Sequence, residues 1–268
     1  MPRQTSQITR LLGIMARLRA PGGCPWDRQQ THASIKLNLI EEAYEVLDAI
    51  ESRNDADLRE ELGDLLLQVT FHAQMAKEKK RFDFEDVARA IADKLVSRHP
   101  HVFGNRKLRT AGQVLDQWHK LKHAEKQHRR PSVTDGVPRH LPALMRAQEV
   151  QKKVARVGFD WSRAGEVLDK VEEEIRELRH EIRRGDRRKM AEELGDLMFA
   201  LVNLARFQKF QAEDLLNQCT KKFAARFRKV EAALAARGKQ PHESTLEEME
   251  AEWQKAKGKK AKGGRRKG

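Results

Sequence analysis

The chain has 268 residues, of which 39% are hydrophobic and 35% are charged, so it can form a core of modest size under a highly charged surface. Its two cysteines exclude a disulfide framework, and there is no run of about 18 apolar residues to span a membrane. We therefore expect a cytoplasmic protein without membrane association.

Much of the basic charge lies at one end of the chain. Residues 255–268 contain eight of the 54 Lys and Arg and no acid, so the other residues carry only +6 of the formal net charge of +14. The composition of this glycine-rich tail predicts no core of its own. A weak contact with nucleic acid is the role that its charge suggests.

Apolar residues recur at helical spacing along almost the whole chain, beginning with an amphipathic segment near residues 4–20. Leu, Ala, Glu, Lys and Arg dominate and no alternating pattern predicts a strand, so we predict an all-α fold. Proline and glycine separate the periodic segments, most clearly at residues 129–138. The other helices are expected near residues 31–53, 55–80, 83–99, 110–127, 141–156, 163–184, 187–208, 211–237 and 244–257.

The hexapeptide EELGDL occurs twice, at residues 60–65 and 192–197, and each copy follows a similar acidic helix. Residues 38–50 resemble residues 170–182, and the four matched acidic positions of the two copies are all 132 residues apart. Such an internal repeat indicates two copies of one helical unit. We predict two tandem helical-bundle domains at 1–128 and 141–257, with a linker at 129–140 and a basic tail at 258–268.

Each copy places two carboxylates on one helix and two on the next. Residues three apart share a helix face, and a short turn joins the helices, so the two pairs can face each other across a hairpin. Carboxylates gathered beside an apolar surface repel one another unless cations neutralise them. Oxygen ligands without Cys or His suit a hard cation, either Mg²⁺ or Mn²⁺. The predicted metal ligands are Glu42, Glu45, Glu61 and Asp64 in the first copy and Glu174, Glu177, Glu193 and Asp196 in the second.

Two other classes of protein fit parts of this pattern. A ferritin-like di-metal carboxylate protein also uses acids on bundle helices, but it requires Glu-x-x-His motifs, and here Asp follows Glu61 and Glu193 at that spacing. A helical nucleic-acid-binding protein would use the basic tail for phosphate contacts. Activity with Mg²⁺ and the absence of iron absorbance would argue against the first class. Deletion of residues 255–268 should abolish the nucleic-acid binding of the second class, and a sharp fall in hydrolysis as well would show that Lys257 or its neighbours matter for catalysis.

Together the motifs resemble the MazG family of nucleoside triphosphate pyrophosphohydrolases. The resemblance rests on the paired ExxE and ExxD motifs, on GGCPWD (22–27) and PHVFG (100–104), and on LPALMRAQ (141–148) followed by VGFDW (157–161). It covers nearly the whole chain except the basic tail. It implies two all-α pyrophosphatase domains, a homodimer, and Mg²⁺-dependent cleavage of nucleoside triphosphates to the monophosphate and pyrophosphate, for nucleotide-pool cleansing or stress regulation.

The resemblance also implies roles for residues of the second copy. The four acids named above would hold the metal, and Glu192 lies beside them. Either Glu192 or Glu193 would accept the proton of the attacking water. The expected nucleotide-binding residues are Lys170, Lys189, Glu192, Lys222, Arg226, Trp253 and Lys257, and Asn203 is added because it lies seven residues after Asp196 and hence on its face.

The two copies differ around their carboxylates. Lys170 and Lys189 correspond to Asn38 and Asp57, so the first copy lacks two of the cations that would neutralise a triphosphate. Asn203 corresponds to Phe71. We therefore expect the second copy to carry most of the activity.

Overall fold

The computed structural model describes residues 6–124 and 131–258. Within these two ranges the chain forms α-helices, one short 3-10 helix and no strand, which confirms the predicted all-α fold. No helix in the described ranges is both long enough and apolar enough to cross a membrane. Most of the predicted basic tail, residues 259–268, lies outside the described residues. The chain divides into two compact units, Met1–Lys126 (unit 1) and Gln127–Gly268 (unit 2).

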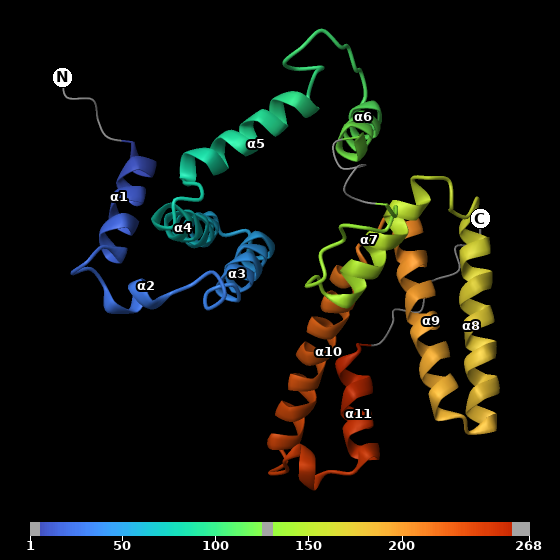
Figure 1. Cartoon of the computed structure of the whole chain (residues 1–268). Helices are drawn as coiled ribbons and strands as arrows, with labels where there is room; N and C mark the ends of the chain where they lie inside the picture. The colour runs from blue at the N-terminus through green and yellow to red at the C-terminus, as the bar shows by residue number, and fades with distance from the viewer. Residues whose placement is uncertain (1–5, 125–130, 259–268) are drawn as a thin grey trace, which may run out of the picture. The chain divides into compact units, whose positions relative to one another are not determined.

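Unit 1 is organised around one long helix. Its elements are α1 (Gln7–Arg19), α2 (Pro25–Gln29), α3 (Asn38–Ser52), α4 (Asp55–Glu78), α5 (Phe84–Arg98) and α6 (Ala111–Ala124), and α4 lies between α1 and α3 (Figure 1). Met15 of α1 and Phe71 and Met75 of α4 form the buried core together with Ile35. Arg19 also ties α1 to α4, because its guanidinium donates two 2.8 Å hydrogen bonds to the carboxylate of Glu78.

The start of α3 differs from the expected helix over residues 31–53. Residues 31–37 form turns in which the backbone N–H of Thr31 donates to Ser34 Oγ at 2.9 Å and that of Ser34 donates to Thr31 Oγ1 at 3.2 Å. Hydroxyl side chains that bond to nearby backbone groups offer the chain an alternative to the helix, so α3 begins only at Asn38. The short α2, which was not expected, begins with a proline, whose fixed φ suits the first helical position.

Unit 2 consists of two helical hairpins and a helix that contacts both. The first hairpin pairs α8 (Ala164–Arg184) with α9 (Arg187–Phe207), and the second pairs α10 (Ala212–Ala235) with α11 (Leu246–Ala256) after a 3-10 helix at Pro241–Glu243 (Figure 1). The helix α7 (Ala143–Ala155) packs on α9 and α10. Gly185 turns the first hairpin with φ of 72°, a conformation that glycine adopts without strain, and Asp186 caps α9.

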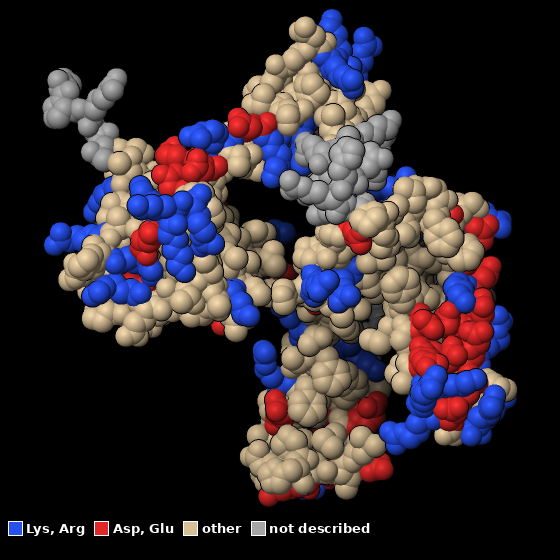
Figure 2. All heavy atoms as spheres, in the orientation of Figure 1, with Lys and Arg blue, Asp and Glu red and all other residues tan. Residues whose placement is uncertain are grey.

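Charge is unevenly distributed over unit 2. Figure 2 shows acidic side chains gathered over α8, with basic side chains beside them. The acids come from the repeated ExxE motif and its neighbours, and the bases near the hairpin turn include Arg183, Arg184 and Arg188. The two hairpins that carry the repeated motifs, α3–α4 and α8–α9, therefore hold the candidate site of each unit.

Candidate functional site

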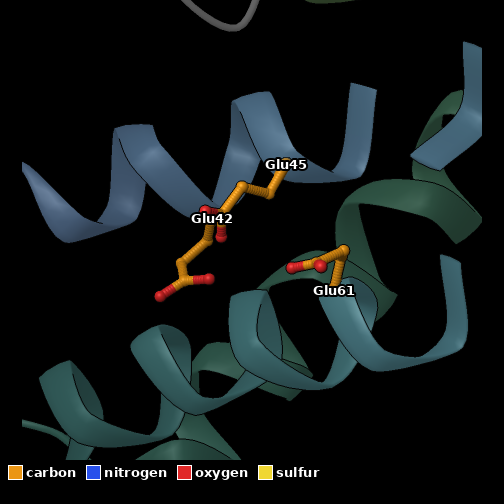
Figure 3. Close-up of side chains that lie close together, drawn as sticks. All are labelled: Glu42, Glu45 and Glu61. Atoms are coloured by element: carbon orange, nitrogen blue, oxygen red, sulfur yellow. The ribbon is translucent and has the colours of Figure 1, made fainter. Parts of the chain in front are cut away.

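In unit 1, three of the four predicted metal ligands come together between α3 and α4. One carboxylate oxygen from each of Glu42, Glu45 and Glu61 lies within 4.8 Å of the other two. Figure 3 shows Glu42 and Glu45 extending from α3, with Glu61 pointing toward them from α4. We refer to these residues as the unit 1 carboxylate group. Their convergence confirms that Glu42 and Glu45 of the ExxE motif face Glu61 of the ExxD motif across the contact between α3 and α4.

The electrostatics of this group favour a bound cation. Loss of hydration raises the pKa of Glu61, and the charges of Glu45 and Asp64 raise it further. Loss of hydration also raises the pKa of Glu42, although a hydrogen bond from Gln68 Nε2 to Glu42 Oε1 (3.3 Å) opposes it. Ionised carboxylates therefore repel one another here, and a cation between them would relieve that repulsion.

Unit 2 repeats the arrangement with a more buried member. Glu174 and Glu177 of α8 and Glu193 of α9 each place an oxygen within 4.8 Å of the other two, and we refer to them as the unit 2 carboxylate group. Glu174 is only 5% exposed. The pKa of Glu193 is raised first by lost hydration and then by the charges of Glu177 and Glu174. The two groups thus bring three carboxylate oxygens equally close together, and the pKa is raised at the equivalent residues Glu61 and Glu193.

The aspartates of the two ExxD motifs lie beside these groups and not within them. Asp64 and Asp196 are absent from the sets of oxygens within 4.8 Å, although Glu61 and Glu193 belong to them. Their charges still reach the site, because each raises the pKa of the glutamate three residues before it. Asp64 and Asp196 therefore add negative charge beside the carboxylate groups of unit 1 and unit 2.

The donor set of both groups fits a hard divalent cation. All the oxygens are carboxylate oxygens that two packed helices hold in place, and such ligands are those that Mg²⁺ and Mn²⁺ prefer. Positive charge is already present in unit 2, where Lys170 Nζ lies 2.7 Å from Glu174 Oε1 and 2.9 Å from Glu173 Oε1. These ion pairs, the one with Glu174 most of all, raise the pKa of Lys170 well above its usual range.

Three of the expected nucleotide-binding residues meet where α10 packs on α11. The guanidinium carbon of Arg226 lies 6.0 Å from the ring centre of Trp253, and Nζ of Lys257 lies 5.9 Å from it. Phe223, which the sequence did not indicate, lies with its ring centre 4.8 Å from that of Trp253 and is 56% exposed. Lys222 is an exposed residue one position before Phe223. The α10–α11 hairpin therefore offers aromatic faces and cations in one place, which is what a nucleotide base and its phosphates require.

The other candidates lie around the α8–α9 hairpin without joining its carboxylate group. Lys189 is exposed in the first turn of α9. Glu192 is also exposed and accepts a hydrogen bond from Arg188 Nε at 3.1 Å. Asn203 is half-buried, and its Oδ1 accepts a 2.8 Å hydrogen bond from Arg206 Nε. Of the two proton-acceptor candidates, Glu193 is the one that the structure brings to the carboxylate group.

The environment of unit 1 differs as its sequence indicates. Asn38 and Asp57 stand where unit 2 has Lys170 and Lys189. Phe71, which corresponds to Asn203, is 5% exposed and belongs to the core. The position therefore serves packing in unit 1, whereas unit 2 keeps an amide there.

Comparison with known proteins gives a consistent result. The profile of the MazG nucleotide pyrophosphohydrolase domain matches residues 30–103 and 165–231, which include both carboxylate groups. A protein of Escherichia coli K12 named nucleoside triphosphate pyrophosphohydrolase is 52% identical over 256 residues, which cover 94% of this chain and 97% of that protein. The Thermotoga maritima nucleoside triphosphate pyrophosphohydrolase/pyrophosphatase MazG is 44% identical over 247 residues, covering 92% and 94% of the two chains.

Proposed function

Because the chain belongs to the MazG nucleotide pyrophosphohydrolase family, we propose that it hydrolyses nucleoside triphosphates, in a Mg²⁺-dependent reaction, to the nucleoside monophosphate and pyrophosphate. The observation that carries the proposal is the convergence of Glu174, Glu177 and Glu193 on two packed helices. Physiologically, such an acid anhydride hydrolase would serve nucleotide-pool cleansing or stress regulation.

The residues of unit 2 divide the work of binding. Glu174, Glu177 and Glu193 would hold the cation, with Asp196 adding negative charge beside it. When bound, Mg²⁺ screens the phosphate charges and lowers the pKa of water. Lys170, Lys189, Lys222 and Arg226 would bind the triphosphate as charged hydrogen-bond donors. The ring of Trp253 would contact the nucleotide, together with Lys257.

The proposed chemical step is an in-line displacement at the α-phosphorus. The oxygen of a water molecule forms a bond to the α-phosphorus, the bond from the α-phosphorus to the α–β bridging oxygen breaks, and pyrophosphate leaves with the bonding electrons. Glu193 would take the proton of the attacking water, since it belongs to the carboxylate group, and Glu192 is the alternative acceptor. Both products must appear in equal amounts.

Product analysis tests the reaction. A panel of nucleoside triphosphates incubated with the protein and Mg²⁺ should yield monophosphate and pyrophosphate, identified by mass. Release of orthophosphate would contradict the proposed bond cleavage. Loss of activity on chelation and its recovery with Mg²⁺ test the cation requirement, with Mn²⁺ as the expected substitute.

We propose that unit 2 carries most of this activity. Lys170 and Lys189 support the proposal, because unit 1 has Asn38 and Asp57 in their places. Glu193→Gln should abolish most of the pyrophosphate release, whereas the matched substitution Glu61→Gln should leave most of it. Equal losses from the two substitutions would contradict the assignment.

A homodimer is the proposed assembly. Apolar side chains are exposed on the helices that carry the carboxylates. Burying these side chains against a second copy of the chain would stabilise a dimer. Leu47 of α3 is 53% exposed, and Leu194 and Met198 of α9 are 49% and 52% exposed. Light scattering should give twice the mass of the chain, and a monomeric mass at micromolar concentration would contradict the proposal.

A separate proposal concerns the basic tail, of which residues 259–268 lie outside the described part of the chain. A weak contact with nucleic acid would arise from the cations of residues 255–268. Deleting residues 259–268 should remove salt-sensitive nucleic-acid binding while triphosphate hydrolysis continues. This deletion keeps Lys257, which lies near Trp253.

A further inference from the structure

Lys170 contacts one member of the unit 2 carboxylate group directly. Its Nζ lies 2.7 Å from Glu174 Oε1 and donates a 2.9 Å hydrogen bond to Glu173 Oε1, so the ammonium group joins two neighbouring acids of α8. Glu174 is buried, and an ion pair with a buried carboxylate is screened less than a pair on the surface. Lys170 therefore neutralises the charge of a residue that is also an expected ligand of the divalent cation.

Unit 1 treats the equivalent carboxylate differently. Its Glu42 accepts a 3.3 Å hydrogen bond from the amide Nε2 of Gln68 on α4. Asn38 occupies the place of Lys170 in unit 1. In unit 2 the buried Ala200 occupies the place of Gln68. The two hairpins therefore stabilise the same carboxylate in two ways, with a neutral amide in unit 1 and with an ammonium group in unit 2.

The ammonium group and a divalent cation compete for Glu174. Positive charges at short range repel each other, and a cation bound to this carboxylate would meet Lys170 beside it. Binding of the cation therefore requires Lys170 to leave Glu174, and the loss of a charge-assisted hydrogen bond lowers the affinity for the cation. A cation that binds Glu42 in unit 1 displaces no charged group from the equivalent position.

A bound triphosphate changes this balance, because its phosphate oxygens offer Lys170 other acceptors. If Lys170 moves from Glu174 to a phosphate, it exchanges one charge-assisted hydrogen bond for another. The carboxylate of Glu174 is then released for the cation. Two ligands that remove the same obstacle bind more tightly together than either does alone, and the effect of each on the other is equal.

We propose that Lys170 competes with the divalent cation for Glu174 and thereby couples the binding of the cation to the binding of the triphosphate in unit 2. This inference rests on the proposed function of the same site. Without nucleotide, unit 1 should bind a divalent cation more tightly than unit 2, although unit 2 has the cations that a triphosphate requires. Unit 2 would take up its cation together with its substrate.

Binding of Mn²⁺ alone, measured by isothermal titration calorimetry in the full-length chain, tests the competition. Substituting Glu42 and Glu61 by Gln first removes the carboxylate group of unit 1. In this parent variant, a further Lys170→Met should lower the Kd for Mn²⁺ about 10-fold or more, because no hydrogen bond between charged groups must be broken. Lys189→Met is the matched control, since it removes an exposed cation outside the carboxylate group, and it should leave the Kd unchanged.

Unit 1 allows the reverse experiment. In a variant that carries Glu174→Gln and Glu193→Gln, only unit 1 keeps its carboxylate group, and this variant should bind Mn²⁺ more tightly than the parent variant above. A further Asn38→Lys should raise the Kd about 10-fold, because it places a lysine four residues before Glu42, the spacing of Lys170 and Glu174.

The coupling is measured with the α,β-methylene analogue of ATP, which cannot be cleaved at the proposed bond. Mn²⁺ should strengthen binding of this analogue less in the Lys170→Met variant than in its parent, and as much in the Lys189→Met variant as in the parent. Equal strengthening in all three proteins would contradict the coupling.

The outcomes separate this inference from the function on which it rests. An unchanged Kd for Mn²⁺ in the Lys170→Met variant overturns the competition and leaves the metal-dependent hydrolysis intact. A parent variant that binds no Mn²⁺ contradicts the proposed cation site as well. Lys170→Asn introduces the residue that unit 1 has at this position, so it supplies a second variant with the same expected gain in affinity if the Met variant unfolds.

Discussion

Gln148 of α7 fixes the loop that leads into α10, and its replacement by Met should destabilise unit 2. The side chain is 3% exposed and forms two hydrogen bonds, from its Nε2 to the carbonyl oxygen of Phe210 and from the backbone N–H of Ala212 to its Oε1, both 2.8 Å long. Met has nearly the same shape and offers neither bond. The substitution therefore tests the polar contacts with little change in packing.

The expected loss follows from where the two backbone groups lie. Ala212 is 8% exposed and stands at the start of α10, where a backbone N–H has no partner within the helix, so its loss should cost about 1–3 kcal/mol. Phe210 is 55% exposed, so water can replace the side-chain amide at its carbonyl oxygen, and that bond should contribute about 1 kcal/mol. Together the free energy of unfolding of unit 2 should fall by about 2–4 kcal/mol.

Gln151→Met is the matched control on the same helix. Gln151 is equally buried, but it donates one hydrogen bond, to the carbonyl oxygen of Phe199, and its own Oε1 has no partner. Phe199 lies inside α9, where its carbonyl oxygen remains in the helix ladder after the substitution. The loss should therefore be about 1 kcal/mol or less.

Native-state hydrogen exchange, measured peptide by peptide, reports the free energy of opening for each unit separately. Peptides of α10 should lose protection in the Gln148→Met variant, whereas peptides of unit 1 should not change. Losses of equal size in the Gln148→Met and Gln151→Met variants would refute the reasoning, because the two side chains differ only in the number and position of their bonds.

Two further predictions concern the site itself. Glu193→Gln should increase the stability of the metal-free protein at pH 7. The raised pKa of Glu193 means that the folded state binds its proton more tightly than the unfolded state does. The advantage of the Gln variant should therefore shrink as the pH falls toward the ordinary glutamate value of 4.5. Thermal melts of both proteins between pH 7 and pH 4.5 measure the difference, and an advantage that grows on acidification would contradict the sign. Trp253→Ala should raise KM for nucleoside triphosphates about 10-fold or more if the ring stacks on the base, and an unchanged KM would exclude that contact.

The helices and both carboxylate groups could be predicted because they depend on local periodicity. Glu42 and Glu45 must share a face at a spacing of three residues, and the short turn before α4 leaves few ways for Glu61 to approach them. The turn at residues 31–37 could not be predicted, because it depends on side-chain hydrogen bonds that compete with the helix.

Contacts between distant segments could not be predicted from the sequence. Phe223 meets Trp253 only because the segment around Pro241 returns the chain along α10, and no spacing rule links residues 30 positions apart.

Phe71 limits how unit 1 could acquire the site that we propose for unit 2. To restore an amide at this position, unit 1 would have to give up an aromatic ring that packs with Met15, Ile35 and Met75 and lies under the guanidinium of Arg19. Removing a buried Phe side chain costs about 3–5 kcal/mol, a large part of the stability of a typical domain. A unit 2-like site would also require cations at positions 38 and 57, which now hold Asn38 and Asp57. Those cations would not restore the stability lost with the Phe71 ring. If unit 2 carries most of the activity, as proposed, a single substitution in unit 1 would not reverse that difference, and engineering a unit 2-like site into unit 1 would have to begin with its core.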